Sequence, residues 1–113
     1  MEIKNYSIGT ALYTFVCESI GTRHGFAHVV HLFRDNYEIS RARCSYLNRT
    51  WEKYRFQSAM MNALFQAFQD EKDRIKSAYK YAHGVSRVSR EKIEKVFSDS
   101  PLLSEYAELR DAL

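Results

Sequence analysis

The sequence predicts a mainly α-helical fold, a compact domain around one long central helix, with at most a small two-stranded β-ribbon in the N-terminal half. Apolar residues recur at helical spacing from Trp51 to Phe68. Eight Tyr and seven Phe in 113 residues indicate a well-packed core and argue against disorder. One Pro and four Gly leave no linker or low-complexity segment, so residues 1–113 are expected to form a single domain.

The central helix is predicted from its apolar stripe. Steps of three and four residues meet Trp51, Tyr54, Ser58, Met61, Phe65 and Phe68, and a second row holds Phe56, Met60, Ala63, Leu64 and Ala67. We expect Thr50 to cap the helix, because its hydroxyl can accept from a free amide of the first turn. After Phe68 the helix either continues as a solvated extension or breaks near Asp70 and restarts. Gly84 is expected to end it.

The N-terminal half is expected to hold two short helices. Thr10 would cap the first and Gly21 would end it, although the β-branched and aromatic content of this segment is high for a helix. The second would cover residues 26–33 and end near Asp35.

An extended segment should follow these helices. Apolar and polar residues alternate through 37–47, which predicts a short strand paired with residues 2–8.

The C-terminal residues predict two further helices. Residues 86–97 form one, with Ser89 as its cap. Ser100 caps the last, and Pro101 is its first residue. The expected apolar face of the last helix comprises Leu102, Leu103, Tyr106, Leu109 and Leu113.

Three histidines have a spacing that zinc ligands use. In a helix, His24, His28 and His31 would share one face. The sequence has no HExxH motif and no evident fourth ligand, so we predict no metal and no cofactor.

The sequence offers little for catalysis. It has no GxSxG, P-loop or paired CxxC motif, and neither Cys17 nor Cys44 has an orienting third group beside a His. We therefore predict that the protein is not an enzyme. Without a secretory signal or an apolar run of about 20 residues, we expect reduced thiols, no membrane span and a cytoplasmic location.

Two basic stretches are the candidate partner-binding sites. The first carries Arg41, Arg43, Arg49, Lys53 and Arg55 among aromatic residues, and the second carries Arg74, Lys76, Lys80, Arg87 and Arg90. Cations of this kind neutralise phosphates, and exposed rings stack on unpaired bases. The net charge of +3 permits a nucleic acid partner without demanding one.

The run YLNRTWEKYRF, Tyr46 to Phe56, resembles a motif of small bacteriophage and prophage proteins of unknown function. The resemblance covers residues 37–64 and transfers no activity. It implies a phage-type interaction protein that binds and blocks a host protein or nucleoprotein in the host cytoplasm, as anti-CRISPR or other anti-defence inhibitors do. The alternative is a small nucleic-acid-binding accessory or regulatory protein that uses stretches 41–55 and 74–90. A homodimer is compatible with both.

Overall fold

The N-terminal half of the chain folds as a four-stranded antiparallel sheet in the computed structural model, which describes residues 2–22, 25–46, 52–84 and 89–113. For residues 22, 25–26, 44–46 and 52–56 it describes the backbone alone. The strands are β1 (Glu2–Ile8), β2 (Ala11–Thr22), β3 (Gly25–Arg34) and β4 (Tyr37–Tyr46). They lie in the order β1-β2-β3-β4, so each strand pairs with the next along the chain.

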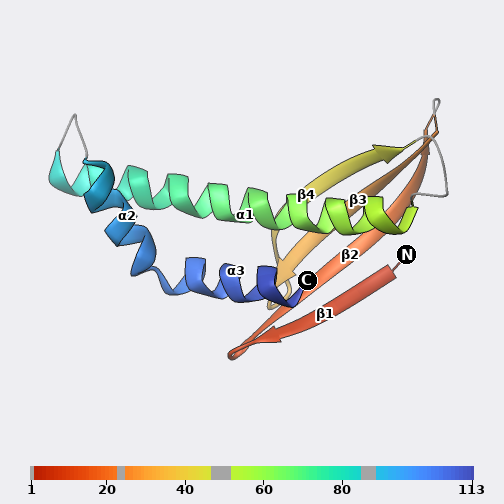
Figure 1. The fold of residues 1–113 in the computed structure, drawn as a ribbon, viewed down its shortest axis with the longest axis horizontal. Helices are drawn as coiled ribbons and strands as arrows, with labels where there is room; N and C mark the ends of the chain where they lie inside the picture. Colours follow the sequence, from red (N-terminus) through yellow and green to blue (C-terminus); the bar gives the residue numbers. More distant parts are fainter. Residues whose placement is uncertain (1, 23–24, 47–51, 85–88) are drawn as a thin grey trace.

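Three helices follow the sheet. They are α1 (Glu52–His83), α2 (Arg90–Ser98) and α3 (Pro101–Ala112). The first part of α1 crosses β3 and β4, while α3 contacts both α1 and β1 (Figure 1). The C-terminal part of α1 extends past the sheet together with α2, and we call this end of the molecule the helical arm (Figure 1). Among the described helices, none combines the length and the apolar character that crossing a membrane requires.

The core lies between the helices and one face of the sheet. Alternate residues of β2 are buried there, including Tyr13, Phe15 and Cys17, because successive side chains of a strand point to opposite faces. Val30 and Leu32 of β3 join them. The helices contribute a buried set comprising Ala59, Met60, Ala63, Leu64, Ala67, Leu103, Tyr106 and Leu109.

The prediction of a mainly α-helical fold is wrong. The segments expected as helices at 10–21 and 26–33 are β2 and β3. Residues 37–46 form a strand as expected, but this strand pairs with β3, and residues 2–8 pair with β2. Both faces of β2 and β3 carry apolar residues, so the alternation that identifies a half-buried strand was hidden.

The turns between strands held the signal that was overlooked. Asp35 and Asn36 both have positive φ, at 49° and 70°, and these values suit the two-residue turn of a β-hairpin. The Asp35 carboxylate also accepts a hydrogen bond from the Leu12 amide at 2.8 Å, which ties this turn to β2. Asp35 therefore ends a strand, where the sequence predicted the end of a helix.

The long helix is confirmed, although its buried face differs from the prediction. It runs without a break through Asp70 for 32 residues. The row that contains Met60 and Leu64 faces the sheet, whereas Phe65 of the other row is 63% exposed. Trp51 and the expected Thr50 cap lie outside the described residues.

The predicted end of α1 and the predicted caps of α2 and α3 are confirmed, although α2 begins at Arg90 and not at residue 86. Gly84 has a positive φ of 58°, and its amide donates to the Lys80 carbonyl at 2.9 Å. Ser89 caps α2 by accepting from the Lys92 amide. Ser100 caps α3 in the same way, with Pro101 in the first turn. Each of these signals acts within a few residues, so it operates in any tertiary context.

Candidate interaction surface

The three described helices pack on one face of the sheet and leave the other uncovered, and we call this second face the open face. Along β2 its residues alternate with the buried ones, from Leu12 to Glu18. Its aliphatic and aromatic members are Ile3, Leu12, Val16, Ile20, Val29 and Phe33. Ile3, Leu12 and Ile20 are 56%, 42% and 45% exposed. The open face is therefore an apolar ridge that the helices leave in contact with solvent.

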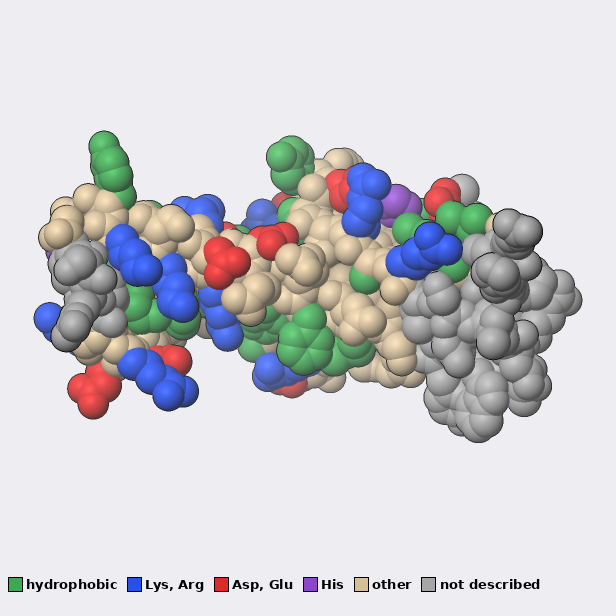
Figure 2. Space-filling view, turned by 90° about the horizontal axis from the view of Figure 1, so that it is seen from above, with side chains coloured by type: hydrophobic (Ala, Val, Ile, Leu, Met, Phe, Trp, Pro, Cys, Tyr) green, Lys and Arg blue, Asp and Glu red, His purple; other side chains and the backbone are tan. Residues whose placement is uncertain are grey.

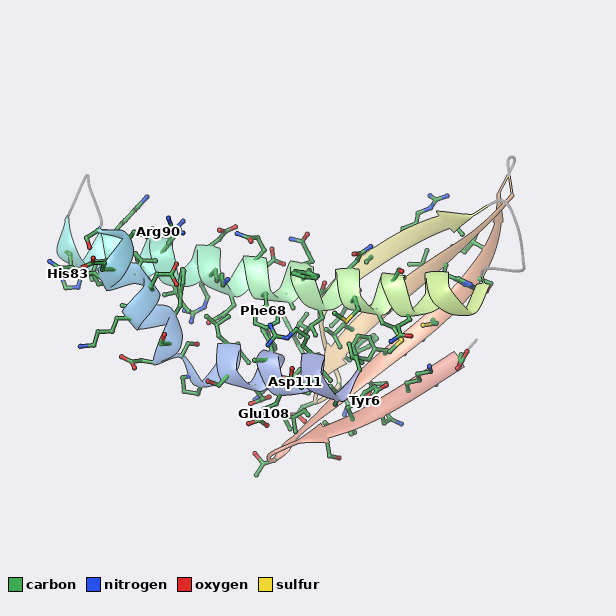
Figure 3. All side chains as sticks on the ribbon, in the orientation of Figure 1. Tyr6, Phe68, His83, Arg90, Glu108 and Asp111 are labelled. Carbon is green, nitrogen blue, oxygen red and sulfur yellow. The ribbon has the colours of Figure 1, made fainter. Side chains whose placement is uncertain are left out.

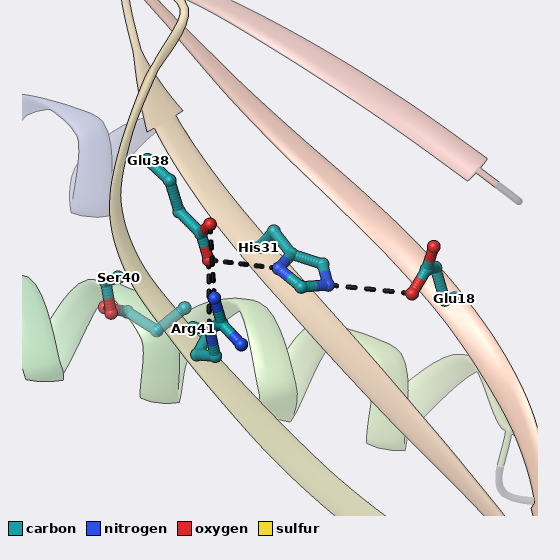
Figure 4. A network of polar contacts seen from close by, with 6 residues as sticks. Glu18, His31, Glu38, Ser40 and Arg41 are labelled. Carbon is teal, nitrogen blue, oxygen red and sulfur yellow. Dashed lines mark hydrogen bonds and ion pairs between the residues drawn. The ribbon is translucent and has the colours of Figure 1, made fainter.

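A network of polar contacts crosses the open face among these apolar residues, with Glu18 between Val16 and Ile20 on β2 (Figure 4). His31 of β3 lies between two carboxylates, with Nδ1 3.0 Å from Glu38 Oε1 and Nε2 3.6 Å from Glu18 Oε2. Glu38 also accepts from Arg41 Nε at 3.0 Å. The hydrogen bond from His31, followed by that from Arg41, lowers the pKa of Glu38 despite its partial desolvation. The network fixes charged groups of both signs at defined positions across β2, β3 and β4.

The first basic stretch lies only partly on this face. Arg41 and Arg43 stand on β4, in register with His31 and Val29 of β3, and both are exposed. Arg49 lies outside the described residues. Lys53 and Arg55 belong to α1, but their side chains also lie outside the described part.

The second basic stretch belongs to the helical arm. Arg74 donates two hydrogen bonds to the Glu71 carboxylate, at 2.9 Å and 2.6 Å, and these bonds raise the pKa of Arg74 above its usual value. Lys76 and Lys80 are exposed one turn apart on α1, and Arg90 begins α2. Arg87 lies outside the described residues.

The structure separates the two basic stretches. Lys and Arg side chains gather on the helical arm in Figure 2, and Figure 3 shows Arg90 and His83 at that same end. Arg41 and Arg43 lie on the sheet, at the other end of a molecule about 50 Å long. The ten predicted residues therefore do not form one continuous surface.

Because residues 25–34 form a strand, the spacing of His28 and His31 does not place them on one face. His28 is buried on the face that meets the helices, and His31 lies on the open face. Residues three apart on a strand point to opposite sides, so the shared helical face expected for them is wrong. His24 lies outside the described residues. Within the described ranges, no three His, Cys, Asp or Glu side chains are grouped so that they could hold a metal ion.

Cys17 is placed as a structural residue. Its thiol is free and buried in the core, and desolvation by burial raises its pKa to about 12. A nucleophilic cysteine needs the opposite, a thiolate stabilised near neutral pH. The Cys44 side chain lies outside the described residues.

Comparisons with known proteins identify no relative. No protein family model, no curated protein and no solved structure matches this chain.

The sequence prediction missed the apolar members of the open face. The signal was present as a second set of alternating apolar residues, exemplified by Leu12, Val16 and Ile20 on β2. The pattern was ambiguous, because residues four apart share one face of a helix as well as one face of a strand. It identified the open face only once the segment was known to be a strand.

Proposed function

We propose that this protein is a non-catalytic interaction protein that binds a host protein or nucleoprotein through the open face. The observation that carries the proposal is the exposed apolar ridge of Ile3, Leu12 and Ile20 on a sheet face that none of the described helices covers. Large apolar side chains exposed together on one face are typical of interaction sites. Blocking of the partner, in the manner of phage-encoded anti-defence inhibitors, is supported by the resemblance of residues 46–56 to phage proteins.

The size of the open face suits a protein partner. Strands lie about 4.8 Å apart and rise about 3.3 Å per residue, so four strands of roughly ten residues cover on the order of 600 Å². A standard protein interface buries about 800 Å² on each partner. The open face, together with the side chains at its edges, reaches this range.

The charge of the open face also favours protein over nucleic acid. Two acids, Glu18 and Glu38, lie among the cations Arg41 and Arg43. Carboxylates repel a phosphate backbone, whereas a balanced set of charges beside apolar residues can orient a protein partner. The network around His31 would then set the register of docking.

Affinity capture from host lysate tests this proposal, with and without nuclease treatment. The test variant replaces three ridge residues, Ile3→Glu, Leu12→Glu and Ile20→Glu. The matched control is Tyr81→Glu, because Tyr81 is 94% exposed and lies on the helical arm. We expect the wild type and the control to retain the same nuclease-resistant host protein, and the triple variant to lose it while its melting temperature stays within a few degrees of wild type.

Two results would overturn the proposal. One is equal capture of the same proteins by the wild type and the folded triple variant. The other is a wild type that sediments as a dimer and a triple variant that sediments as a monomer, with no difference in host protein capture, because a second copy would then be the partner of the open face.

A second candidate function is nucleic acid binding by the helical arm. The observation that favours it is the exposed trio of Lys76, Lys80 and Arg90 at one end of the molecule. Glu91 and Glu94 on α2 reduce the positive charge of this end. Loss of the captured partner after nuclease treatment would favour this candidate over the open face.

A further inference from the structure

A separate hollow lies beside α1, next to the end of α3 and on neither of the surfaces described above. Its volume is about 180 Å³. The apolar part of its lining comes from Met61, Leu64, Phe65 and Phe68, which recur at three- and four-residue intervals along α1. Figure 3 shows Phe68 between α1 and α3. The hollow is thus an apolar site between two helices that are already fixed by the core.

Two cations stand in the lining, and both are held by aromatic rings. The guanidinium of Arg110 lies 6.0 Å from the centre of the Phe68 ring, and Lys72 Nζ lies 5.7 Å from that of Phe97. The Phe68 ring itself packs edge-to-face on Tyr106, with centroids 5.5 Å apart. Cation–π contacts of this kind restrict where the charges can lie. Positive charge therefore borders the apolar floor at defined positions.

The acids near the hollow already have partners. Asp111 pairs with Arg110 at 3.6 Å, Asp70 accepts from Gln66 at 2.8 Å, and Asp73 accepts from Gln69 at 3.3 Å. Among the residues that the structure describes, Lys72 forms no ion pair, and the Arg110 side chain, although paired with Asp111, remains half exposed. A ligand carboxylate can thus approach the two cations from the solvent side.

The volume limits what can enter. An apolar cavity of about 150 Å³ holds a benzene molecule, whereas sites for cofactors and drug-sized ligands occupy about 300–1,000 Å³. The hollow accordingly fits one aromatic or branched aliphatic side chain. We propose that it binds a segment of a protein partner that inserts one such side chain, with a flanking Asp or Glu on Lys72 and Arg110.

Short peptides provide the direct test. The probe is acetyl-Glu-Phe-Glu-amide, and the two controls replace both Glu by Lys or replace Phe by Ala. NMR titration should show shifts of the Met61 methyl and the Phe68 ring signals with the probe. We expect its Kd to be about tenfold lower than that of either control peptide, since charge-assisted contacts and the buried ring each contribute.

Reversing the charges of Lys72 and Arg110 tests whether these two cations determine the preference for an acidic peptide. The double variant Lys72→Glu with Arg110→Glu should reverse the preference, so that the lysine peptide binds better than the glutamate peptide. Lys80→Glu is the matched control, because Lys80 is exposed on the same helix and does not line the hollow. If the double variant fails to fold, Lys72→Gln alone should reduce the preference for the glutamate peptide several-fold.

The proposal is overturned if glutamate and lysine peptides bind equally, or if the shifts fall outside the hollow. The outcome of the peptide test does not depend on whether the open face binds a partner. Substitution at Ile3, Leu12 and Ile20 should leave peptide binding unchanged, and Lys72→Gln should leave capture through the open face unchanged. Failure of one proposal therefore does not imply failure of the other.

Discussion

Arg34, the last residue of β3, holds Glu105 of α3 through two nitrogen atoms. Nε lies 2.9 Å from Oε1 and Nη2 lies 3.3 Å from Oε2. The hydroxyl of Tyr13 also donates to Oε1. The Glu105 carboxylate thereby fixes α3 to the two neighbouring strands β2 and β3. Arg34 and Glu105 are 71 positions apart in the chain.

Loss of the Glu105 carboxylate should destabilise the protein in a pH-dependent way. Burial raises the pKa of Glu105, but the hydrogen bonds from Arg34 and Tyr13 outweigh it and lower the pKa below its usual value of 4.5. A depressed folded-state pKa gives stability that is complete above the unfolded pKa and is lost as pH falls through the folded value. We expect Glu105→Gln to cost about 2 kcal/mol at pH 7 and progressively less as the pH falls below the unfolded value of 4.5.

Urea unfolding from pH 7 to pH 3 measures this difference. Glu108→Gln serves as the control, because Glu108 is exposed on the same helix. A cost for Glu105→Gln that stays constant with pH would show that the carboxylate charge is not the source of the stability.

Truncation to Ala should lower the free energy of unfolding far more at Leu64 than at its neighbour Phe65. Leu64 is fully buried against the sheet, so Leu64→Ala leaves a cavity and should cost about 2–5 kcal/mol. Phe65 is largely exposed, and Phe65→Ala should cost less than about 1 kcal/mol. Chemical denaturation of both variants measures the costs. Equal costs would contradict the face of α1 that the structure places against the sheet.

Cys17 should resist alkylation in the folded protein. Its burial and its raised pKa of about 12 both oppose thiolate formation at pH 8. Treatment with iodoacetamide followed by peptide mass spectrometry measures labelling at Cys17 specifically. We expect labelling in urea and little in buffer over the same time. Rapid labelling under native conditions would place the thiol at the surface.

The helical arm should bind random duplex DNA only weakly. We expect a Kd of micromolar order or poorer at physiological salt, rising steeply with salt, because a few cations contact phosphates without reading bases. The triple variant Lys76→Glu, Lys80→Glu and Arg90→Glu should weaken this binding further and flatten its salt dependence. Fluorescence anisotropy at three salt concentrations measures both. Tight, salt-tolerant and sequence-selective binding would instead make the arm the principal site.

Local features could be predicted from the sequence because they depend on neighbouring residues. The Ser89 and Ser100 caps and the end of α1 at Gly84 each involve a side chain or a backbone angle acting within four residues. The long helix was also predictable, since its apolar repeat continues for several turns. For the candidate site, the exposed positions of Lys76 and Lys80 followed from the same periodicity.

Apart from the Asp35-Asn36 turn, the identity of the N-terminal elements depended on pairing between strands rather than on a local pattern. Leu12 and Tyr13 are both apolar, yet one lies on the open face and the other in the core. A strand with two apolar faces and a short apolar helix have similar composition, so only the hydrogen bonds to neighbouring strands distinguish them. The open face was therefore invisible until β2 and β3 were placed side by side.

The face of α1 that meets the sheet was likewise decided by tertiary structure. The part of α1 that ends at Phe68 carries apolar residues on most sides, so hydrophobicity alone favoured no single orientation of it. The sheet selected the row with the smallest residues, Ala59, Ala63 and Ala67, which lets the two backbones approach closely. Ser40 of β4 then donates to the Ala63 carbonyl at 2.6 Å. A row of large rings could not come so near, and this is the physical reason that Phe65 lies outside the core.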